Sequence, residues 1–150
     1  MNRMRPPRAP RRQSGLSLIE VLIAVLIMAV GLLGIAALQA VTLRNSQSAF
    51  DRTQATVLSY AILDAMRANA TAARANSYNV GMTCTIPAAG GTLVSHDHNT
   101  WISSIKATMG DSACGSIACA SNICTITIRW NDSRATGGDA NETLTTTSRI

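Results

Sequence analysis

An uninterrupted apolar stretch near the start of the chain limits the possible folds more than any other feature. Residues 21–38 contain no charged and no strongly polar side chain, and a run of this length can span a bilayer as a helix. We therefore predict a transmembrane helix over residues 16–38. The rest of the chain has only one Phe, two Tyr and two Trp, so we expect a small, thinly cored domain outside the membrane.

The charge distribution predicts how this helix is oriented. Of the 13 Lys and Arg side chains, five arginines precede Gly15, which leaves eight basic side chains against eight acidic ones in residues 16–150. Such an excess of arginine before a span is typical of its cytoplasmic side. We expect a single-pass protein of the inner membrane with residues 40–150 in the periplasm. Because the net charge of +5 belongs to the leader, it does not indicate a nucleic-acid site.

One carboxylate, Glu20, lies among the apolar residues near the start of the span. A charge in this setting usually has a partner and a function, but the next basic side chain, Arg44, is roughly 36 Å away along a helix. Cleavage after Gly15 would create an amino group on Leu16, one turn from Glu20. Two alternatives remain open: an ordinary secretory signal cut near residues 37–40, which would not need the carboxylate, and an interfacial Glu20 without a role.

Residues 11–20, with the sequence Arg-Arg-Gln-Ser-Gly-Leu-Ser-Leu-Ile-Glu, resemble the class III signal of type IV prepilins. The resemblance implies that a prepilin peptidase cuts after Gly15 and methylates Leu16. It also implies that Glu20 pairs with the N-terminus of a neighbouring subunit during assembly. Leu16 stands where phenylalanine is usual in that family, but it keeps the apolar character.

Residues 31–74 and the segment 125–132 further resemble PilV-type minor pilins, the type IV pilus modification proteins. This resemblance implies an α+β, type IV pilin-like fold, in which a small antiparallel sheet packs on the upper half of a long N-terminal helix. It implies a structural subunit and no enzyme, without a cofactor, that primes pilus assembly and ends in a cell-surface pilus. The implied partners are other pilins and minor pilins, the prepilin peptidase, the inner membrane and the pilus assembly platform.

Two other functions remain open at this point. A minor pseudopilin of a type II secretion system uses the same leader chemistry. A membrane-anchored periplasmic binding module would keep its leader and would not polymerise. The sequence does not separate roles in adhesion, motility or DNA uptake.

Residues 39–75 show the pattern of an amphipathic helix that continues the span. Apolar side chains recur there at steps of three and four, and no proline occurs between Gly15 and Ile86. We predict one rod of about 58 residues with stop signals at Asn76 and Gly81. The expected buried stripe consists of Phe50, Val57, Leu58, Ala61, Ile62, Ala65 and Met66.

Residues 76–150 are expected to form a small disulfide-bonded domain. A short helix is predicted to begin with Asp97 as its N-cap and to end at Gly110, with Trp101, Ile102, Ile105 and Met109 facing inward. Residues 125–130 alternate as a half-buried strand does, and residues 144–150 repeat the pattern more weakly. With a loop at 132–141 between them, these strands predict an antiparallel meander.

The four cysteines are Cys84, Cys114, Cys119 and Cys124. An even number in a small domain outside the cytoplasm predicts disulfides, with three possible connectivities. If residues 121 and 122 form a tight hairpin turn, Cys119 opposes Cys124 within bonding distance, which leaves Cys84 to Cys114. The other two connectivities remain open.

A few titratable side chains raise the question of a metal or catalytic site. Zinc bound by the cysteines with His96 or His98 is the competing chemistry, but the cysteine spacing is not a standard zinc pattern. We expect no metal site, and we expect His96, Asp97 and His98 to form a polar helix start with exposed imidazoles. No catalytic motif is present in the sequence, so we expect no catalytic residues.

Overall fold

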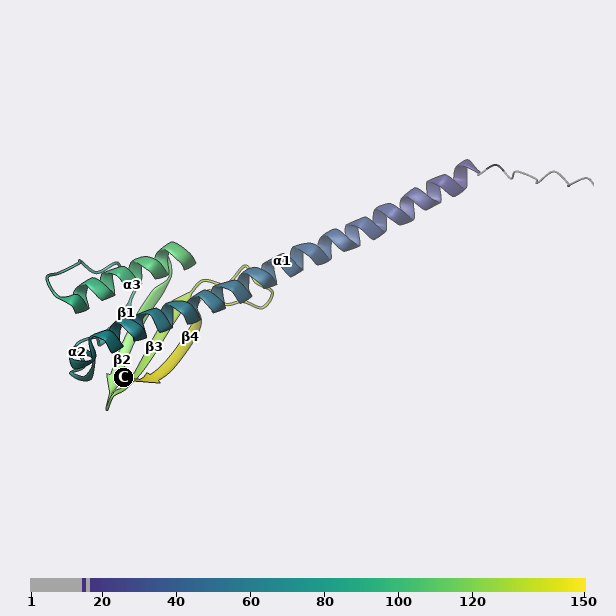
Figure 1. Ribbon diagram of the computed structural model, residues 1–150. Coiled ribbons are helices and arrows are strands. Elements are labelled where there is room, and N and C mark those ends of the chain that lie inside the picture. Colours follow the sequence, from purple (N-terminus) through teal and green to yellow (C-terminus); the bar gives the residue numbers. More distant parts are fainter. Residues whose placement is uncertain (1–14, 16) are drawn as a thin grey trace, which may run out of the picture. The chain divides into compact units, whose positions relative to one another are not determined.

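The computed structural model describes Gly15 and residues 17–150 (Figure 1). Leu16 and the expected leader, apart from Gly15, lie outside the described residues. The elements along the chain are α1 (Leu18–Ala68), α2 (Ala70–Arg74), β1 (Val80–Thr83), α3 (Leu93–Met109), β2 (Cys114–Ala120), β3 (Ile123–Trp130) and β4 (Glu142–Arg149). By its internal contacts the chain divides into two units, Met1–Gln39 and Ala40–Ile150, which we describe separately.

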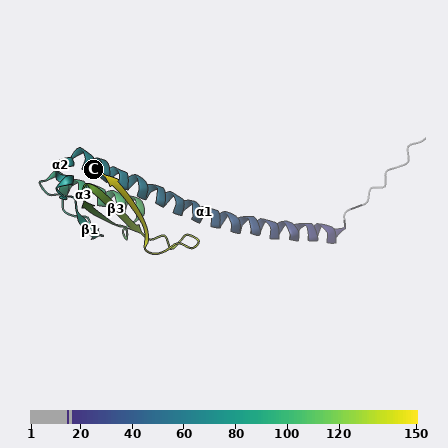
Figure 2. The same cartoon turned by 90° about the horizontal axis from the view of Figure 1, so that it is seen from below.

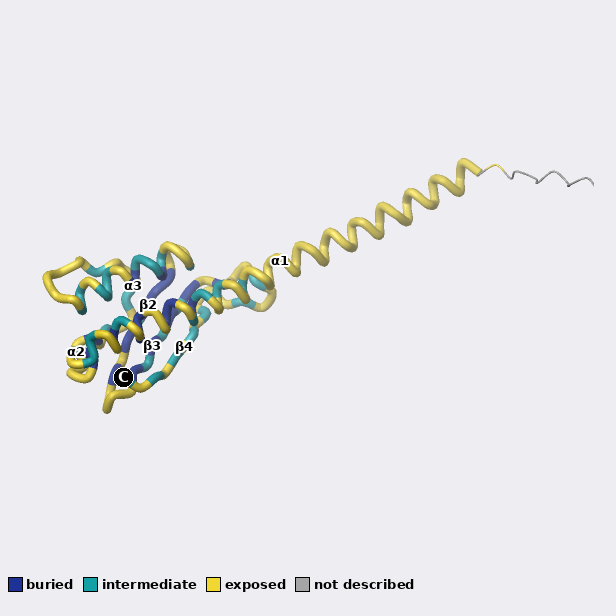
Figure 3. Tube along the Cα trace, in the orientation of Figure 1, coloured by how far each residue is buried: buried dark blue, intermediate teal, exposed yellow. Residues whose placement is uncertain are grey.

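In the first unit, every described residue of α1 is solvent-exposed (Figure 3). The sequence there is rich in leucine, isoleucine, valine and alanine and contains one methionine. Leucine, methionine and alanine form helices readily, and the segment contains no proline. The helix α1 is long and apolar enough to cross a membrane. Since none of the described residues of this unit covers its apolar surface, lipid or other helices are the environments that suit it.

In the second unit, α1 buries one face against a sheet. The buried residues are Ala55, Leu58, Ser59, Ile62, Leu63 and Met66. The predicted stripe was therefore wrong at three positions, because Phe50 is 52% exposed, Val57 is 55% exposed and Ala61 is exposed as well. Successive helical residues lie 100° apart, so Val57 and Leu58 lie on different faces of the helix. Apolar residues occupy both faces, and their spacing alone does not show which face packs.

The predicted single rod is interrupted at Asn69. Helix α1 ends at Ala68, and the five-residue helix α2 follows from Ala70. The side-chain amide of Asn69 donates a hydrogen bond to the hydroxyl of Tyr78, nine positions later, at 3.2 Å. The local sequence does not predict this contact. The predicted stop at Asn76 is confirmed, since its φ of 59° is left-handed and asparagine tolerates this conformation. Gly81 instead lies within β1.

The four strands form an antiparallel meander in the order β1-β2-β3-β4. Together with the long apolar helix, this sheet confirms the predicted α+β, pilin-like architecture. In β3, Ile126, Ile128 and Trp130 are buried while the residues between them are partly exposed, as the alternation predicted. The four-residue edge strand β1, which has an irregular register on β2, was not predicted from the sequence.

Helix α3 closes the core beside α1 (Figure 2). Its buried residues are Trp101, Ile102 and Ile105, and the indole Nε1 of Trp101 donates to the carbonyl of Leu58 at 3.0 Å. The predicted N-cap was wrong: Thr92 caps the helix in a reciprocal capping box with Ser95, so Asp97 lies inside the helix. Gly110 is the C-cap, with a φ of 92°, and the predicted end of the helix is confirmed.

Candidate functional site

The first candidate site is the start of α1. The backbone N–H groups of Glu20 and Val21 donate to the carbonyl of Ser17 at 3.0 and 3.3 Å. These bonds make Ser17 the residue that precedes the first helical position, so Glu20 occupies the third. A Ser followed three residues later by Glu is the sequence of a capping box, and the positive end of the helix dipole favours a carboxylate there. A local helix-start role for Glu20 is therefore available besides the predicted pairing.

Local helix geometry does not supply Glu20 with a cation. Within the described part of the chain, the two ion pairs join Arg52 to Glu142 at 2.9 Å and Arg67 to Asp64 at 2.7 Å. Glu20 takes part in neither, and its residue is exposed. The predicted processing position Gly15 is likewise exposed and precedes the helix, whereas Leu16 lies outside the described residues.

The second candidate site is the set of four cysteines, which the structure joins in two disulfides. Cys119 and Cys124 oppose each other in the β2–β3 hairpin, with their Cα atoms 4.0 Å apart. The turn residues Ser121 and Asn122 both have positive φ, as a two-residue hairpin turn requires. The second bond joins Cys84 to Cys114, with Cα atoms 4.3 Å apart. This is the connectivity that the hairpin geometry favoured.

The residues around His96 form a hydrogen-bonded structural cluster. Tyr78 donates its hydroxyl hydrogen to the carboxylate of Asp97 at 2.5 Å, and His98 Nε2 lies 3.1 Å from the carbonyl of Tyr78. Burial, and then the bond to Asp97, raise the pKa of Tyr78 to about 12. His96 is exposed, as expected, whereas the expectation of an exposed His98 was wrong because it packs edge-on against Tyr78.

These side chains belong to the packing of α3 and do not converge on a reacting position. In the described residues, no group of three or more His, Cys, Asp or Glu side chains is placed to hold a metal ion. Tyr78, the residue at the centre of the cluster, was missed by sequence analysis. A lone tyrosine in the turn between α2 and β1 carries no signal that its hydroxyl meets a carboxylate 19 residues later.

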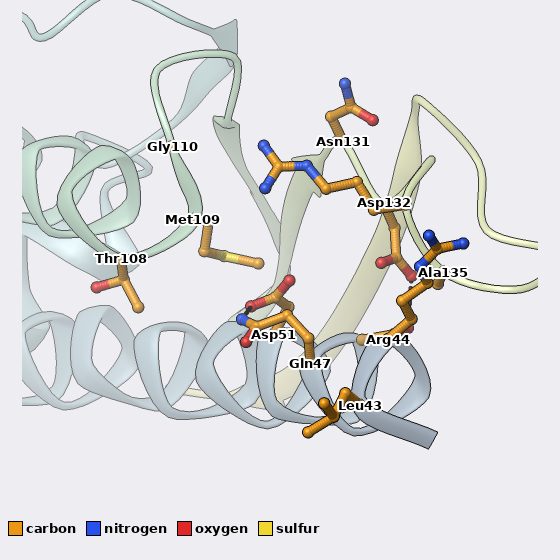
Figure 4. Close-up of a pocket in the computed structure, with 12 residues that line it drawn as sticks. Leu43, Arg44, Gln47, Asp51, Thr108, Met109, Gly110, Asn131, Asp132 and Ala135 are labelled. Carbon is orange, nitrogen blue, oxygen red and sulfur yellow. Dashed lines mark hydrogen bonds between the residues drawn. The ribbon is translucent and has the colours of Figure 1, made fainter. Parts of the chain in front are cut away.

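A pocket of about 500 Å³ lies in the second unit between α1, the end of α3 and the loop that follows β3 (Figure 4). Its lining has both charges, with Arg44 and Arg134 against Asp51 and Asp132. Asp132 is buried and accepts a hydrogen bond from the Ser48 hydroxyl at 2.5 Å. This contact ties the loop to α1. A serine bonded to a carboxylate without an intervening base is not an activated nucleophile.

Comparison with known proteins gives one finding, and it concerns the helix start. A family model described as the prokaryotic N-terminal methylation motif matches residues 10–36. The match includes Gly15, Leu16 and Glu20, together with most of the apolar stretch. The chain matches no curated protein and no solved structure. The segment thus carries a prepilin-type signal, which indicates a type IV pilin-like or pseudopilin-like prepilin, a structural subunit anchored by its apolar helix.

Proposed function

We propose that this chain is a minor pilin, a structural subunit that enters and primes a type IV pilus. The observation that carries the proposal is the prepilin-type signal over residues 10–36, with Glu20 as the lone acidic residue in the apolar half of α1. The helix start and the small disulfide-bonded sheet domain both fit such a subunit. The resemblance to PilV-type minor pilins, in residues 31–74 and 125–132, favours the pilus over other prepilin-based machines.

In this proposal, a prepilin peptidase removes the leader after Gly15 and methylates Leu16. The new ammonium group then stands four positions before Glu20 in the sequence. On a neighbouring subunit the same ammonium group offers Glu20 a cation to pair with. Because an unpaired buried charge is strongly unfavourable, this contact sets the axial register between adjacent helices.

Assembly follows from exchanging lipid for protein around the apolar helix. Residues 18–39 expose their apolar side chains on all sides, so neighbouring helices can replace lipid on every face. A contact between different surfaces of identical or similar subunits does not close on itself and produces a filament. Before assembly, the subunit is held in the inner membrane with residues 40–150 in the periplasm, as the five leader arginines favour, and the pilus assembly platform extracts it from there.

The alternatives are a minor pseudopilin of a type II secretion system and an anchored periplasmic binding module. Deletion of the gene distinguishes the pilin from the pseudopilin. Loss of surface filaments with intact secretion supports the pilin, whereas loss of secretion with intact filaments supports the pseudopilin. An anchored module would remain in the membrane fraction with its leader attached.

The pairing mechanism is tested by separating the two roles that are open to Glu20. Glu20→Gln keeps a side chain that can complete a capping box but removes the charge. Ser17→Ala removes the cap but keeps the charge, and it serves as the matched control. We expect Glu20→Gln to reach the membrane normally and to fall about tenfold or more in sheared filaments, because the neighbouring ammonium group is left unpaired.

Ser17→Ala should enter filaments nearly as the wild type does. Quantitative immunoblotting of membrane and sheared-filament fractions measures both variants. Equal incorporation of Glu20→Gln and wild type would exclude charge pairing. A defect confined to Ser17→Ala would assign the site to helix capping.

A further inference from the structure

The Cys84–Cys114 disulfide lies beside a cation on the outer face of the sheet. Cys114 in β2 is directly opposite Arg129 in β3. The guanidinium Nη2 of Arg129 is 3.2 Å from Sγ of Cys114 and 3.5 Å from Sγ of Cys84. Among the described residues Arg129 takes part in neither ion pair, so its charge faces the two sulfur atoms without a carboxylate to neutralise it.

The two sulfur atoms differ in how accessible they are. Cys84 follows the edge strand β1 and is exposed, whereas Cys114 is only 1% exposed. An external thiolate therefore reaches Cys84 first. Attack on one sulfur expels the other as a thiolate, so the expelled group is Cys114, the cysteine nearer to the Arg129 guanidinium.

The contact with Arg129 favours this particular leaving group. A neighbouring cation lowers the pKa of a thiol, and a thiol of lower pKa leaves faster in disulfide exchange. The carbonyl oxygen of Ser112 lies 3.2 Å from the same sulfur and would accept a hydrogen bond from the protonated thiol. This neutral contact opposes the thiolate, but a charge-assisted bond is about twice as strong as a neutral one, so the guanidinium dominates.

We propose that Cys84–Cys114 is a thiol–disulfide exchange site whose partner is an external dithiol. One thiolate of the dithiol attacks Sγ of Cys84, a mixed disulfide forms there, and Cys114 leaves as a thiolate held by Arg129. The second thiol of the dithiol loses its proton and attacks the dithiol's first sulfur, which is bonded to Cys84 in the mixed disulfide. This step releases Cys84 as a thiolate. The dithiol is thereby oxidised to a disulfide, and the protein gains two thiols. Run in reverse, the same steps close the bond during folding.

The second disulfide provides a contrast within the same molecule. Cys119 is 7% exposed and Cys124 is fully buried, and both point to the inner face of the sheet with Ile117 and Ile126. None of the described hydrogen bonds brings a guanidinium to these sulfur atoms. Exchange should therefore open one bond selectively, releasing the segment between β1 and α3 from β2 while the hairpin stays closed.

The test uses the full-length protein in mild detergent with dithiothreitol as the dithiol probe. Samples are quenched with a maleimide over time, and peptide mass mapping gives the opening rate of each disulfide. We expect Cys84–Cys114 to open first in the wild type. Arg129→Gln should slow this opening about threefold to tenfold, Arg129→Lys should keep most of the rate, and Arg149→Gln, a matched exposed arginine on β4, should have no effect.

The opening rate of Cys119–Cys124 reports in the same samples on whether a variant has loosened the fold. Simultaneous opening of both bonds in the wild type would overturn the proposal, as would earlier opening of Cys119–Cys124. An unchanged or faster opening of Cys84–Cys114 in Arg129→Gln would also overturn it.

Discussion

The two disulfides should stabilise the folded domain by different amounts, because they close loops of different length. The bonds join residues separated by 30 positions in Cys84–Cys114 and by 5 positions in Cys119–Cys124. The loop-entropy relation gives about 3.6 kcal/mol for the first and about 2.1 kcal/mol for the second. The longer loop should thus contribute about 1.5 kcal/mol more to the free energy of unfolding.

The comparison requires that one cross-link be broken while the packed atoms stay the same. Two variants serve: Cys119→Ala with Cys124→Ala keeps only the long loop, and Cys84→Ala with Cys114→Ala keeps only the short one. In each variant, the oxidised and the reduced protein differ only by one S–S bond. The difference between their free energies of unfolding, measured in urea, is therefore the contribution of that bond. A pH of about 5 keeps the thiols protonated, which suppresses any contribution from Arg129.

Fluorescence reports the unfolding directly, because Trp101 and Trp130 are 4% and 1% exposed and both lie in this core. Each variant is measured in the same detergent, so the contribution of the apolar helix cancels between the oxidised and reduced forms. Equal contributions from the two bonds, or a larger one from Cys119–Cys124, would refute the loop-entropy reasoning. The difference between the bonds would then have to come from native-state contacts.

Two further predictions concern the core and its pH dependence. Gly115→Ala should destabilise the domain by about 1–3 kcal/mol, because its Cβ would lie 2.6 Å from the ring of Trp101; Gly81→Ala, which has open space, is the control, and equal urea midpoints for the two variants would count against this packing. Burial and the bond to Asp97 raise the pKa of Tyr78 from 10.0 to about 12. The protonated tyrosine therefore stabilises the folded state relative to the unfolded one. This stabilisation should be complete below about pH 10 and should disappear as the pH rises towards about 12. Urea midpoints of Tyr78→Phe should lack this pH dependence. The same pH dependence in both proteins would contradict the prediction.

The parts of the fold that the sequence predicted are those with a local physical signal. The alternation of Ile126, Ile128 and Trp130 with polar residues identifies a half-buried strand, and its inward face is indeed buried. The hairpin between Cys119 and Cys124 depends on two turn residues and a register that follows from them. These features need no information from distant parts of the chain.

The errors occurred where distant contacts decide between equal local signals. Val57 and Leu58 are both apolar, and only the position of the sheet determines that Leu58 is the buried one. Thr92 and Asp97 are both good N-caps, but Asp97 is engaged by the hydroxyl of Tyr78. Arg129 looked like an ordinary outward-facing strand residue until the register placed it beside Cys114.

The mass of the mature N-terminus tests the central proposal most directly. The protein is purified from the membrane and filament fractions of the native cell, and its N-terminal peptide is measured by mass spectrometry. The account predicts a chain that begins at Leu16 and carries one added methyl group on its α-amino nitrogen. A mature chain that still contains Met1 and the five leader arginines would contradict it.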